Sequence, residues 1–492
     1  MLGEAARTEV DAEVYYQSYY AAISAIGKAN QQDNVIDANG ISVKLSALYP
    51  RYHFSHHDSV MAVLLPRIKA LCICAKAYRQ GLSIDAEESE RLDISLDIFS
   101  ALAEDKDLAG WDGLGFVLQA YQKRAPAVAD WLLALAKKTE RRLMVRLVKG
   151  AYWDAEIKHA QEQGFKDYPV FTRKANTDLC YQVCAEKLLD AQAFIYPQFA
   201  THNAYTTCLI AALGKGKRFE FQRLHGMGDL LYRHLRSEHQ GSINPLRVYA
   251  PIGQHQDLLP YLVRRLLENG ANSSFVNRFL DQQTTVESLL EDVQAQVVQR
   301  VPYRNGSIAL PVDIFRAGND NRDNAKGIDL DNPLAVEKLL QTISQAHTPQ
   351  HAAAIVGGEP CGGVFEEVVS PADDQRVVGH CAEAGDKDIE RALSLACSSQ
   401  AQWQRVTGEF RAVTLERMAD ALEQYCEELI TLIVAEAGRT IPDALSEVRE
   451  AVDFCRYYAQ SARHYFADDN TQTLQACGTF LCISPWNFPL AI

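Results

Sequence analysis

Charged and aromatic side chains gather at one end of an apolar run near residue 150. The run Leu143–Val148 is short and apolar, which is typical of a strand buried on both faces of a parallel sheet. Arg146 lies inside it, and Lys149, Tyr152 and Trp153 follow it. Since an unpaired charge inside such a strand would be very costly, Arg146 needs an anionic partner. That partner is either a bound phosphate or carboxylate, or an aspartate in an Arg–Asp pair inside a barrel.

Polar side chains also stand near or just after the ends of other apolar runs. They are Lys44 and Ser46, Asp85 and Glu87, Gln119, His202 and Asn203, His225, and Tyr249. In barrels of alternating parallel strands and helices, the reacting face is built from the carboxyl ends of the strands. The series therefore predicts a site at that face, although strand ends also carry polar residues simply because they reach water.

Two adjacent arginines lie on an amphipathic pattern further along the chain. Arg264 and Arg265 are followed by Glu268, which is four residues after the first and three after the second, so it can brace either guanidinium. A braced arginine pair above a barrel mouth suits bidentate capture of a carboxylate. The alternative is a solvated helix face whose salt bridge contributes less than about 1 kcal/mol.

The elements that must position these residues alternate between strand and helix up to about residue 290, which predicts parallel βα units and a (β/α)8 barrel. Such a barrel takes about 250 residues. Helical patterns cover Ser59–Tyr78, Ala125–Glu140, Asp178–Leu189 and Gln256–Asn269. The seven expected strands are Ile41–Leu48, Leu82–Ala86, Gly113–Ala120, Leu143–Val148, Phe194–Ala200, Phe219–Leu224 and Leu246–Ala250. The missing first strand is expected just before residue 1, as in a fragment of a longer protein.

Eight ordered motifs of the chain resemble the proline dehydrogenase barrel of the bacterial bifunctional proline utilization A family. They are Ile41-Ser-Val-Lys-Leu-Ser46, Ile84-Asp-Ala-Glu-Glu88, Arg146-Leu-Val-Lys-Gly-Ala-Tyr-Trp153, Phe171-Thr-Arg-Lys174, Ala200-Thr-His-Asn203, Phe221-Gln-Arg-Leu-His-Gly-Met227, Val248-Tyr-Ala-Pro-Ile-Gly253 and Arg264-Arg-Leu-Leu-Glu-Asn-Gly270. The resemblance implies a distorted barrel that binds FAD over its carboxyl-terminal mouth, without a Rossmann fold.

The resemblance also assigns roles to individual residues. It implies that the carboxylate of L-proline is held by Lys44, Arg264 and Arg265, in a pocket shaped and braced by Asp85, Tyr152, Tyr249 and Glu268. It implies that FAD is held by Gln119, Arg146, Val148, Lys149, Gly150, Ala151, Trp153, Thr172, Arg173, Lys174, Thr201, His202, Asn203, Gln222 and Leu224. The expected reaction is the oxidation of proline to pyrroline-5-carboxylate, with electrons passed on to a quinone at the membrane. A homo-oligomer of the longer protein is compatible with this picture.

The second part of the chain has a different character. Residues 301–350 are expected to be a connector, rich in Pro, Gly, Asn and Asp at its start, and residues 351–492 to begin another domain after a barrel domain over 1–300. Helices are expected at 334–346, 386–401, 409–436 and 444–465, strands at 365–370 and 479–483, and a loop around residues 356–360. The motif Ser484-Pro-Trp-Asn-Phe-Pro489 resembles the start of an aldehyde dehydrogenase domain.

In that family the residue matching Asn487 donates to the oxyanion, and Trp486 would lie by NAD. In the bifunctional family this domain oxidises glutamate semialdehyde with NAD, but the chain stops before the nucleophilic cysteine and the general-base glutamate. We therefore expect no aldehyde dehydrogenase activity from this chain, with NAD bound only by the longer protein.

The composition argues against nucleic-acid-binding, membrane-spanning and secreted proteins. A net charge of -14 and the lack of a basic arm argue against nucleic-acid binding. No apolar run is long enough to span a bilayer, and no signal peptide begins the chain. Together with twelve scattered cysteines, this predicts a reducing cytoplasm. Peripheral contact at the inner face of the membrane is implied only by the resemblance, through the quinone.

Neither a metal site nor a phosphate loop is expected. His53, His56 and His57 share a polar loop that is more typical of a surface turn than of a metal site, and no GxGxxG or P-loop follows a strand. Two rival functions stay open. One is a barrel enzyme acting on a phosphorylated substrate that Arg146 and Lys149 would bind, and the other is a truncated, non-catalytic scaffold.

Overall fold

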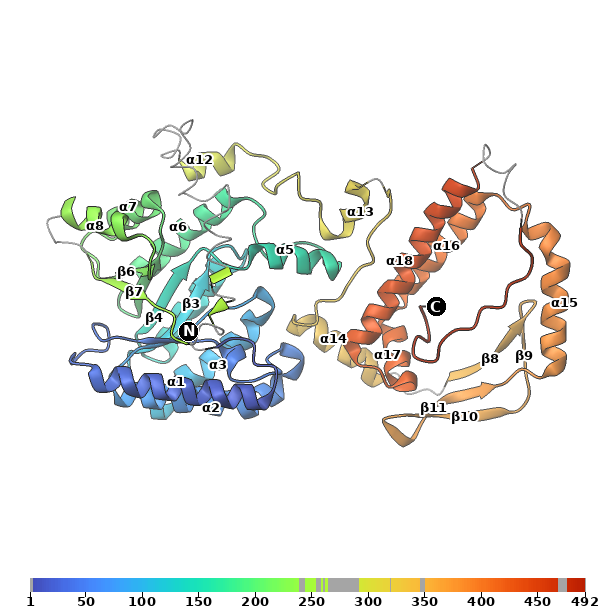
Figure 1. Cartoon of the computed structure of the whole chain (residues 1–492), viewed down its shortest axis with the longest axis horizontal. Coiled ribbons are helices and arrows are strands. Elements are labelled where there is room, and N and C mark those ends of the chain that lie inside the picture. Colours follow the sequence, from blue (N-terminus) through green and yellow to red (C-terminus); the bar gives the residue numbers. More distant parts are fainter. Residues whose placement is uncertain are drawn as a thin grey trace. The chain divides into compact units, whose positions relative to one another are not determined.

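The computed structural model describes residues 3–238, 244–253, 258–259, 262–263, 292–318, 320–345, 350–467 and 476–491. By packing, the chain forms two compact units (Figure 1). The first comprises Met1–Lys158 and Tyr168–Ile308, and the second His159–Asp167 and Ala309–Ile492. Each unit is described by itself. The domain boundaries expected at residues 300 and 350 stay predictions.

The first unit is built on seven parallel strands that pair in chain order, as in a βα barrel. The strands are β1 (Ile41–Val43), β2 (Leu82–Ile84), β3 (Leu114–Gln119), β4 (Leu143–Val148), β5 (Ile195–Ala200), β6 (Glu220–Leu224) and β7 (Leu246–Tyr249). All seven expected strands are therefore confirmed, although β1 is shorter than expected because residues 45–47 turn into a 3-10 helix, η1. The strand expected before residue 1 stays a prediction.

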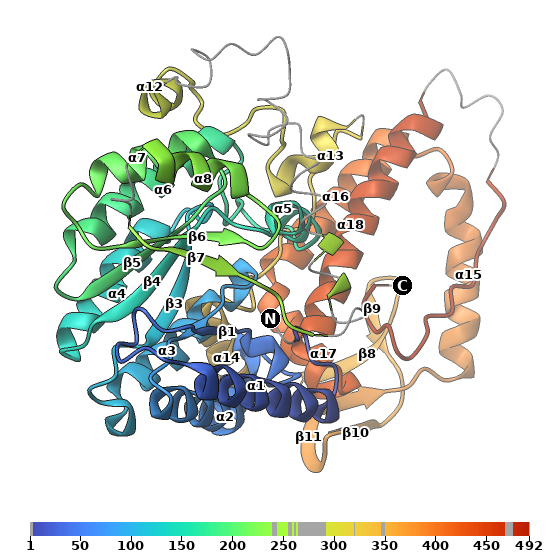
Figure 2. The same cartoon turned by 60° about the vertical axis from the view of Figure 1, so that its left-hand side comes forward.

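Helices follow the strands and lie around the sheet (Figure 2). They are α1 (Glu9–Ala29), α2 (His57–Ala77), α3 (Leu92–Glu104), α4 (Ala125–Lys138), α5 (Trp153–Glu162), α6 (Lys174–Asp190), α7 (Ala204–Leu213), α8 (Asp229–Glu238) and α12 (Val293–Val298). Three further 3-10 turns are η2 (Phe54–His56), η3 (Ser89–Arg91) and η4 (Lys106–Leu108). The helices expected at 59–78, 125–140 and 178–189 are confirmed. The one expected at 256–269 lies almost wholly outside the described residues.

One apolar core fills the space between the strands and the inner faces of helices α1 to α4 and α6 to α8. Phe99 of α3 packs on Phe116 of β3 with ring centroids 5.0 Å apart, and Phe219 lies between Phe199 and Phe221 at 5.4 and 5.2 Å. Removing such rings from water is the main favourable contribution to folding here. The buried strands explain why the sheet's sequence is apolar on both faces.

A long-range tie joins the last described strand to the loop before the first. Arg247 of β7 donates to the backbone oxygens of Ala38 and Ile36, each at 2.6 Å. The same guanidinium pairs with Glu220 of β6, which is completely buried. Breaking such a buried ion pair is strongly destabilising, so β6, β7 and the loop at residues 36–38 are held together.

The second unit contains a four-stranded sheet in the order β10-β11-β8-β9, together with helices. Its strands are β8 (Gln350–Val356), β9 (Glu359–Cys361), β10 (Phe365–Ser370) and β11 (Asp373–Ala382). Its helical segments are η5 (Pro311–Asp313), α13 (Ile314–Ala317), α14 (Pro333–Gln345), α15 (Asp386–Trp403), α16 (Gly408–Gln424), α17 (Cys426–Ala437) and α18 (Ile441–Tyr465). Helices α16 and α18 run side by side (Figures 1 and 2).

Three expectations for this unit were wrong. The segment 479–483 forms no strand, and Phe480, Leu481 and Ile483 are exposed. The loop expected around residues 356–360 is a hairpin between β8 and β9, whose turn places Gly357 and Gly358 at φ of +67° and +87°. The helix expected at 409–436 is interrupted at Tyr425 between α16 and α17. The helices at 334–346, 386–401 and 444–465 and the strand at 365–370 are confirmed.

None of the helices in the described part of the chain combines the length and the apolar character needed to cross a lipid bilayer.

Candidate active site

A buried ammonium and a phenol meet where β1 and β4 end. Lys44 follows β1, is 4% exposed, and donates from Nζ to Tyr152 Oη at 2.7 Å. Burial alone would lower the pKa of Lys44, but Tyr152, Asp85, Glu87 and Glu4 outweigh it and raise that pKa well above its usual value. Burial raises the pKa of Tyr152 to about 12. At neutral pH this pair is therefore an ammonium and a neutral phenol.

Arg146 has a partner within the protein. Its guanidinium lies 3.4 Å from Asp85, which follows β2, and donates to Ser42 Oγ at 2.7 Å. Of the two partners that the sequence left open for Arg146, the structure contains the Arg–Asp pair. The guanidinium also lies 5.4 Å from the ring centre of Tyr249, at the end of β7. Burial raises the pKa of Tyr249 far above its usual value, so this phenol stays neutral.

A cavity of about 270 Å³ borders this group inside the first unit. Arg146, Gln198, Gln222 and Tyr249 line it. Two buried polar atoms of these residues have no hydrogen-bond partner within the described structure, namely Arg146 Nε and Gln198 Oε1. Since buried polar atoms are normally satisfied, the cavity suits a polar guest. Its volume is close to the lower end of the range for small-molecule pockets, which is about 300 Å³.

A second positive group lies after β4 and at the start of α6. Lys149 and Lys174 both pair with Asp178, the latter at 2.5 Å. Burial lowers the pKa of Lys149, whereas the two ammonium groups overcome burial and lower the pKa of Asp178. Asp178 was missed in the sequence, although its place four residues after Lys174 was a visible signal. The trio keeps one net positive charge, which suits an anionic guest.

Residues beside this group are fixed by the backbone near residue 304. Arg173 donates from Nε to the backbone oxygen of Arg304 at 2.9 Å, and Thr172 Oγ1 accepts from the backbone N–H of Asn305 at 2.9 Å. Trp153, the first residue of α5, donates from its indole to the backbone oxygen of Phe171 at 2.8 Å. These contacts bring the residues expected to hold a cofactor after β4 next to those at the start of α6.

Further expected residues lie at the ends of β3, β5 and β6. Gln119 donates to the backbone oxygen of Glu87 at 2.7 Å, and the backbone N–H of Leu224 donates to His202 Nε2 at 3.0 Å. Asn203 caps α7 by accepting from the backbone N–H of Thr206. Three more of the expected residues are largely engaged in local structure, namely Thr201, Gln222 and Gly150. Val148 and Ala151 are half-buried beside them.

The other expected residues form two groups. Arg264, Arg265 and Glu268 lie outside the described residues. Asn487 and Trp486 belong to the second unit, where the backbone oxygen of Asn487 accepts from Arg439 at 2.7 Å and Trp486 is 89% exposed.

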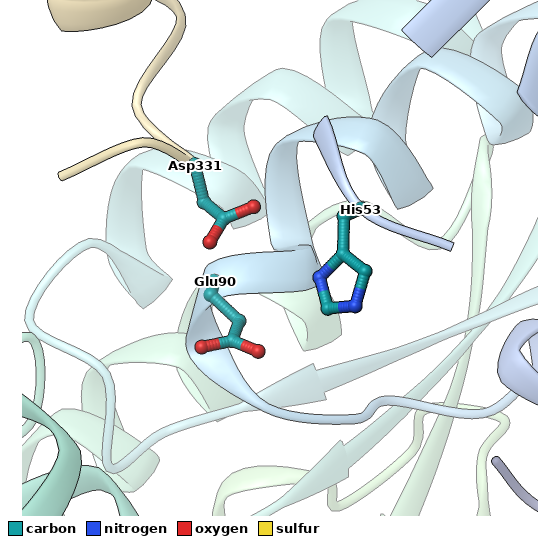
Figure 3. A group of neighbouring side chains, drawn as sticks. All are labelled: His53, Glu90 and Asp331. Carbon is teal, nitrogen blue, oxygen red and sulfur yellow. The ribbon is translucent and has the colours of Figure 1, made fainter. Parts of the chain in front are cut away.

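The loop histidines fall in the first unit. Figure 3 shows His53 beside Glu90 of η3, with ligand atoms within 4.8 Å of each other, and Asp331, which belongs to the second unit. Burial and the nearby Arg91 lower the pKa of His53, so it is neutral at neutral pH. His53 and Glu90 supply only two ligands from this unit, fewer than the three or four protein ligands of zinc sites.

Two family models match the chain. The proline dehydrogenase family matches residues 1–278, and the aldehyde dehydrogenase family matches residues 360–492. The chain is 46% identical over 506 residues to the bifunctional protein PutA of Escherichia coli (strain K12), covering 100% of this chain and 38% of that protein. It is 43% identical to the protein of the same name in Rhizobium meliloti, covering 99% of this chain and 39% of that one.

Among solved structures, a mutant proline utilization A from Bradyrhizobium japonicum superposes with a TM-score of 0.87. The sequences are 43% identical, and the match covers 100% of this chain and 48% of that one. The chain thus spans less than half the length of these relatives.

Proposed function

Because the chain belongs to the proline dehydrogenase family, we propose that its first unit oxidises L-proline to pyrroline-5-carboxylate with FAD. The observation that carries this proposal is the group of Lys44, Tyr152, Arg146, Asp85 and Tyr249 at the carboxyl ends of four strands, within the region that matches the family. Its two cations, Lys44 and Arg146, are buried. When bound, the flavin supplies the hydride acceptor. The protein supplies binding, orientation and charge.

The cofactor residues that we propose fit a flavin in two respects. The Lys149–Lys174–Asp178 trio has one net positive charge and lies next to Arg173 and Thr172, which suits the phosphates of FAD. The buried Nε of Arg146 has no partner in the described structure, so this nitrogen can donate to a cofactor. The remaining cofactor residues expected from the sequence are proposed on the same basis.

The substrate residues that we propose bind the carboxylate of proline and line the pocket around it. The carboxylate needs a buried cation, and Lys44 keeps its charge at 4% exposure because acidic and phenolic groups surround it. We propose that Arg264 and Arg265 bind the same carboxylate and that Glu268 braces them. We also propose that Asp85, Tyr152 and Tyr249 line the pocket. Fixing the ring in one orientation supplies much of the rate.

We also propose that the chain works in the cytoplasm and meets the inner face of the membrane, where a quinone takes the electrons. Proline-dependent reduction of a soluble quinone analogue by the purified protein tests the acceptor. Reduction of an artificial dye without reduction of the quinone contradicts this part of the proposal. Size-exclusion chromatography with light scattering tests for a homo-oligomer.

We propose that the second unit alone does not form a complete aldehyde dehydrogenase active site. Its matches cover only 28% of an α-ketoglutaric semialdehyde dehydrogenase and 35% of a 1-pyrroline-5-carboxylate dehydrogenase. Oxidation of glutamate semialdehyde with NAD, with Asn487 at the oxyanion, is therefore proposed only for a longer polypeptide. Formation of NADH from pyrroline-5-carboxylate by the 492-residue chain contradicts this.

The deciding experiment is a single turnover. The purified chain is saturated with FAD, freed of excess cofactor and mixed anaerobically with L-proline while its absorbance is recorded. We expect the bound flavin to bleach, a variant Lys44→Met to bleach much more slowly, and Lys106→Met, which removes an exposed lysine of η4, to behave as the parent. A chain that holds flavin but does not bleach, or that holds none, overturns the proposal. Tight binding of a phosphorylated substrate instead favours the rival enzyme.

A further inference from the structure

Two buried carboxylates each hold a serine that belongs to another strand-end loop. Glu87 follows β2 and is 8% exposed, and Glu156 lies on α5 and is 4% exposed. Glu87 was expected from the sequence only as a polar residue at a strand end, with no binding role of its own, and Glu156 was not expected at all. Charged groups are rarely buried this deeply unless they are paired, so each must have a structural or functional use.

Glu87 joins the end of β2 to the end of β1. Its carboxylate accepts from the backbone N–H of Ser46 at 3.0 Å and from the Ser46 hydroxyl, and it pairs with Arg91 at 3.0 Å. Ser46 comes two residues after Lys44 and lies in η1. The short 3-10 turn that ends β1 is therefore fixed by a carboxylate from the neighbouring strand, and Lys44 is fixed with it.

Glu156 makes the equivalent contact one step further around the sheet. Its carboxylate accepts from the backbone N–H of Ser89 at 2.7 Å, from the Ser89 hydroxyl at 2.5 Å and from Tyr121 Oη at 3.0 Å. Its own backbone N–H donates to the oxygen of Tyr152 at 2.9 Å. The loops that follow β2, β3 and β4 thus meet at one side chain.

Tyr121 connects the contacts of Glu156 with the residues before Tyr152. Its backbone N–H donates to the oxygen of Lys149 at 2.6 Å, and a side chain at Gly150 would lie 2.3 Å from its ring. The Glu156 carboxylate therefore acts on both sides of the Lys149–Tyr152 turn. Movement of α5 relative to the β2 loop would break hydrogen bonds to a buried charge, which is costly.

We infer that Glu87 and Glu156 are positioning residues, which hold Lys44 and Tyr152 against each other and against Asp85 through Ser46, Ser89 and Tyr121. The inference rests on the proposed function, since the aligned group is the one proposed to hold proline. It predicts that the two carboxylates govern alignment of the substrate rather than retention of the flavin.

The main test is Glu156→Gln, which keeps the size of the side chain but removes its charge and one acceptor. Asp154→Asn is the matched control, because Asp154 is exposed in the same first turn of α5 and carries the same charge. Both variants lose the same favourable interaction with the helix dipole. Only Glu156→Gln alters the contacts of this side chain with Ser89 and Tyr121.

In the anaerobic turnover, we expect Glu156→Gln to reduce the limiting bleaching rate or the affinity for proline by about tenfold or more, the effect of losing one charge-assisted hydrogen bond. Flavin content should stay at the parent's level, and Asp154→Asn should leave all three quantities unchanged. Ser89→Ala and Tyr121→Phe each remove one hydroxyl and should give smaller losses of the same kind. These two variants carry the test if Glu156→Gln does not fold.

A readout without turnover separates this inference from the proposed function. Fluorotyrosine placed at position 152 reports the surroundings of that ring by fluorine NMR in the absence of proline. We expect its resonance to shift or broaden in Glu156→Gln and not in Asp154→Asn. An unchanged resonance together with unchanged kinetics overturns the inference, as does a loss of flavin that matches the loss of rate. A parent chain that never bleaches overturns the proposed function, and the resonance then still decides the positioning role.

Discussion

Lys44 keeps an ammonium charge in a place that is almost closed to water, because a phenol and several carboxylates surround it. Tyr152→Phe removes the oxygen that accepts from its Nζ at 2.7 Å. A hydrogen bond to a charged group contributes about 1.5–3 kcal/mol. We therefore expect kcat/KM for proline to fall about 10- to 100-fold with flavin content unchanged. Steady-state kinetics with a dye acceptor measures this.

Tyr20→Phe is the control for that substitution, because Tyr20 lies on α1 and is 46% exposed. It should leave the kinetics unchanged. An unchanged kcat/KM in Tyr152→Phe contradicts the role given to the Lys44–Tyr152 pair.

Asp178 gives the first unit a defined acid sensitivity. Burial would raise its pKa, but Lys149 and Lys174 lower it below the usual 3.8. A carboxyl whose folded pKa is depressed contributes stability above its unfolded pKa, and this contribution is lost as the pH falls from 3.8 through the folded value. We expect urea midpoints of the parent to fall over that range, and those of Asp178→Asn to fall less. Equal acid slopes for both proteins contradict the assignment.

At the residue scale, the sequence was informative about residue types and less so about partners. The buried charge of Arg146 was correctly taken to need an anion, but Asp85 is 61 residues away and only the parallel pairing of the strands brings them together. Ser89, Tyr121 and Glu156 carried no signal, and Ser46 was visible only as a polar residue at a strand end, since a serine or a glutamate is ordinary in a loop or helix until its distant partner is known.

At the scale of elements, the turn after β4 depends on one glycine. Gly150 has φ of +142°, and a Cβ there would lie 2.3 Å from the buried Tyr121 ring. Gly150→Ala should therefore suffer backbone strain and a clash, and we expect the free energy of unfolding to fall by about 3 kcal/mol or more. Denaturant titration of the first unit's transition measures it.

Gly110→Ala separates the two causes, because Gly110 has φ of +73° with nothing within 4 Å of the added carbon. It should cost only the backbone strain, about 1 kcal/mol. Equal losses in the two variants would show that the contact with Tyr121 has no effect.

The elements that were predicted well are those whose pattern matches their burial. The seven strands of the first unit are apolar runs in a covered sheet, so their positions were evident. The segment 479–483 has the same composition, but no strand partner for it exists in the described residues. The β8–β9 hairpin was missed although Gly357-Gly358 favours the tight turn that it forms. Composition alone does not show whether a strand-like segment has another strand to pair with.

At the scale of the whole molecule, each unit has an apolar core of its own. We therefore expect two transitions in calorimetry. Ile430→Ala deletes a fully buried side chain of α17. Such a deletion costs about 2–5 kcal/mol, which should lower the second unit's transition by roughly 4–20 °C.

Leu102→Ala makes the reciprocal change in α3 of the first unit, where Leu102 is fully buried. Each substitution should shift one transition and leave the other in place. A single transition that both substitutions shift equally would mean that the two cores unfold as one.

The tie made by Arg247 has a consequence for synthesis on the ribosome. Its guanidinium binds carbonyl groups 209 and 211 residues earlier in the chain. The segment at 36–38 leaves the exit tunnel long before its partner is translated, so it stays without this contact while the six intervening strands, β1 to β6, emerge. Contacts of such wide sequence separation form late and slowly. A chaperone that shelters nascent chains would therefore act on this protein chiefly before Arg247 has left the exit tunnel.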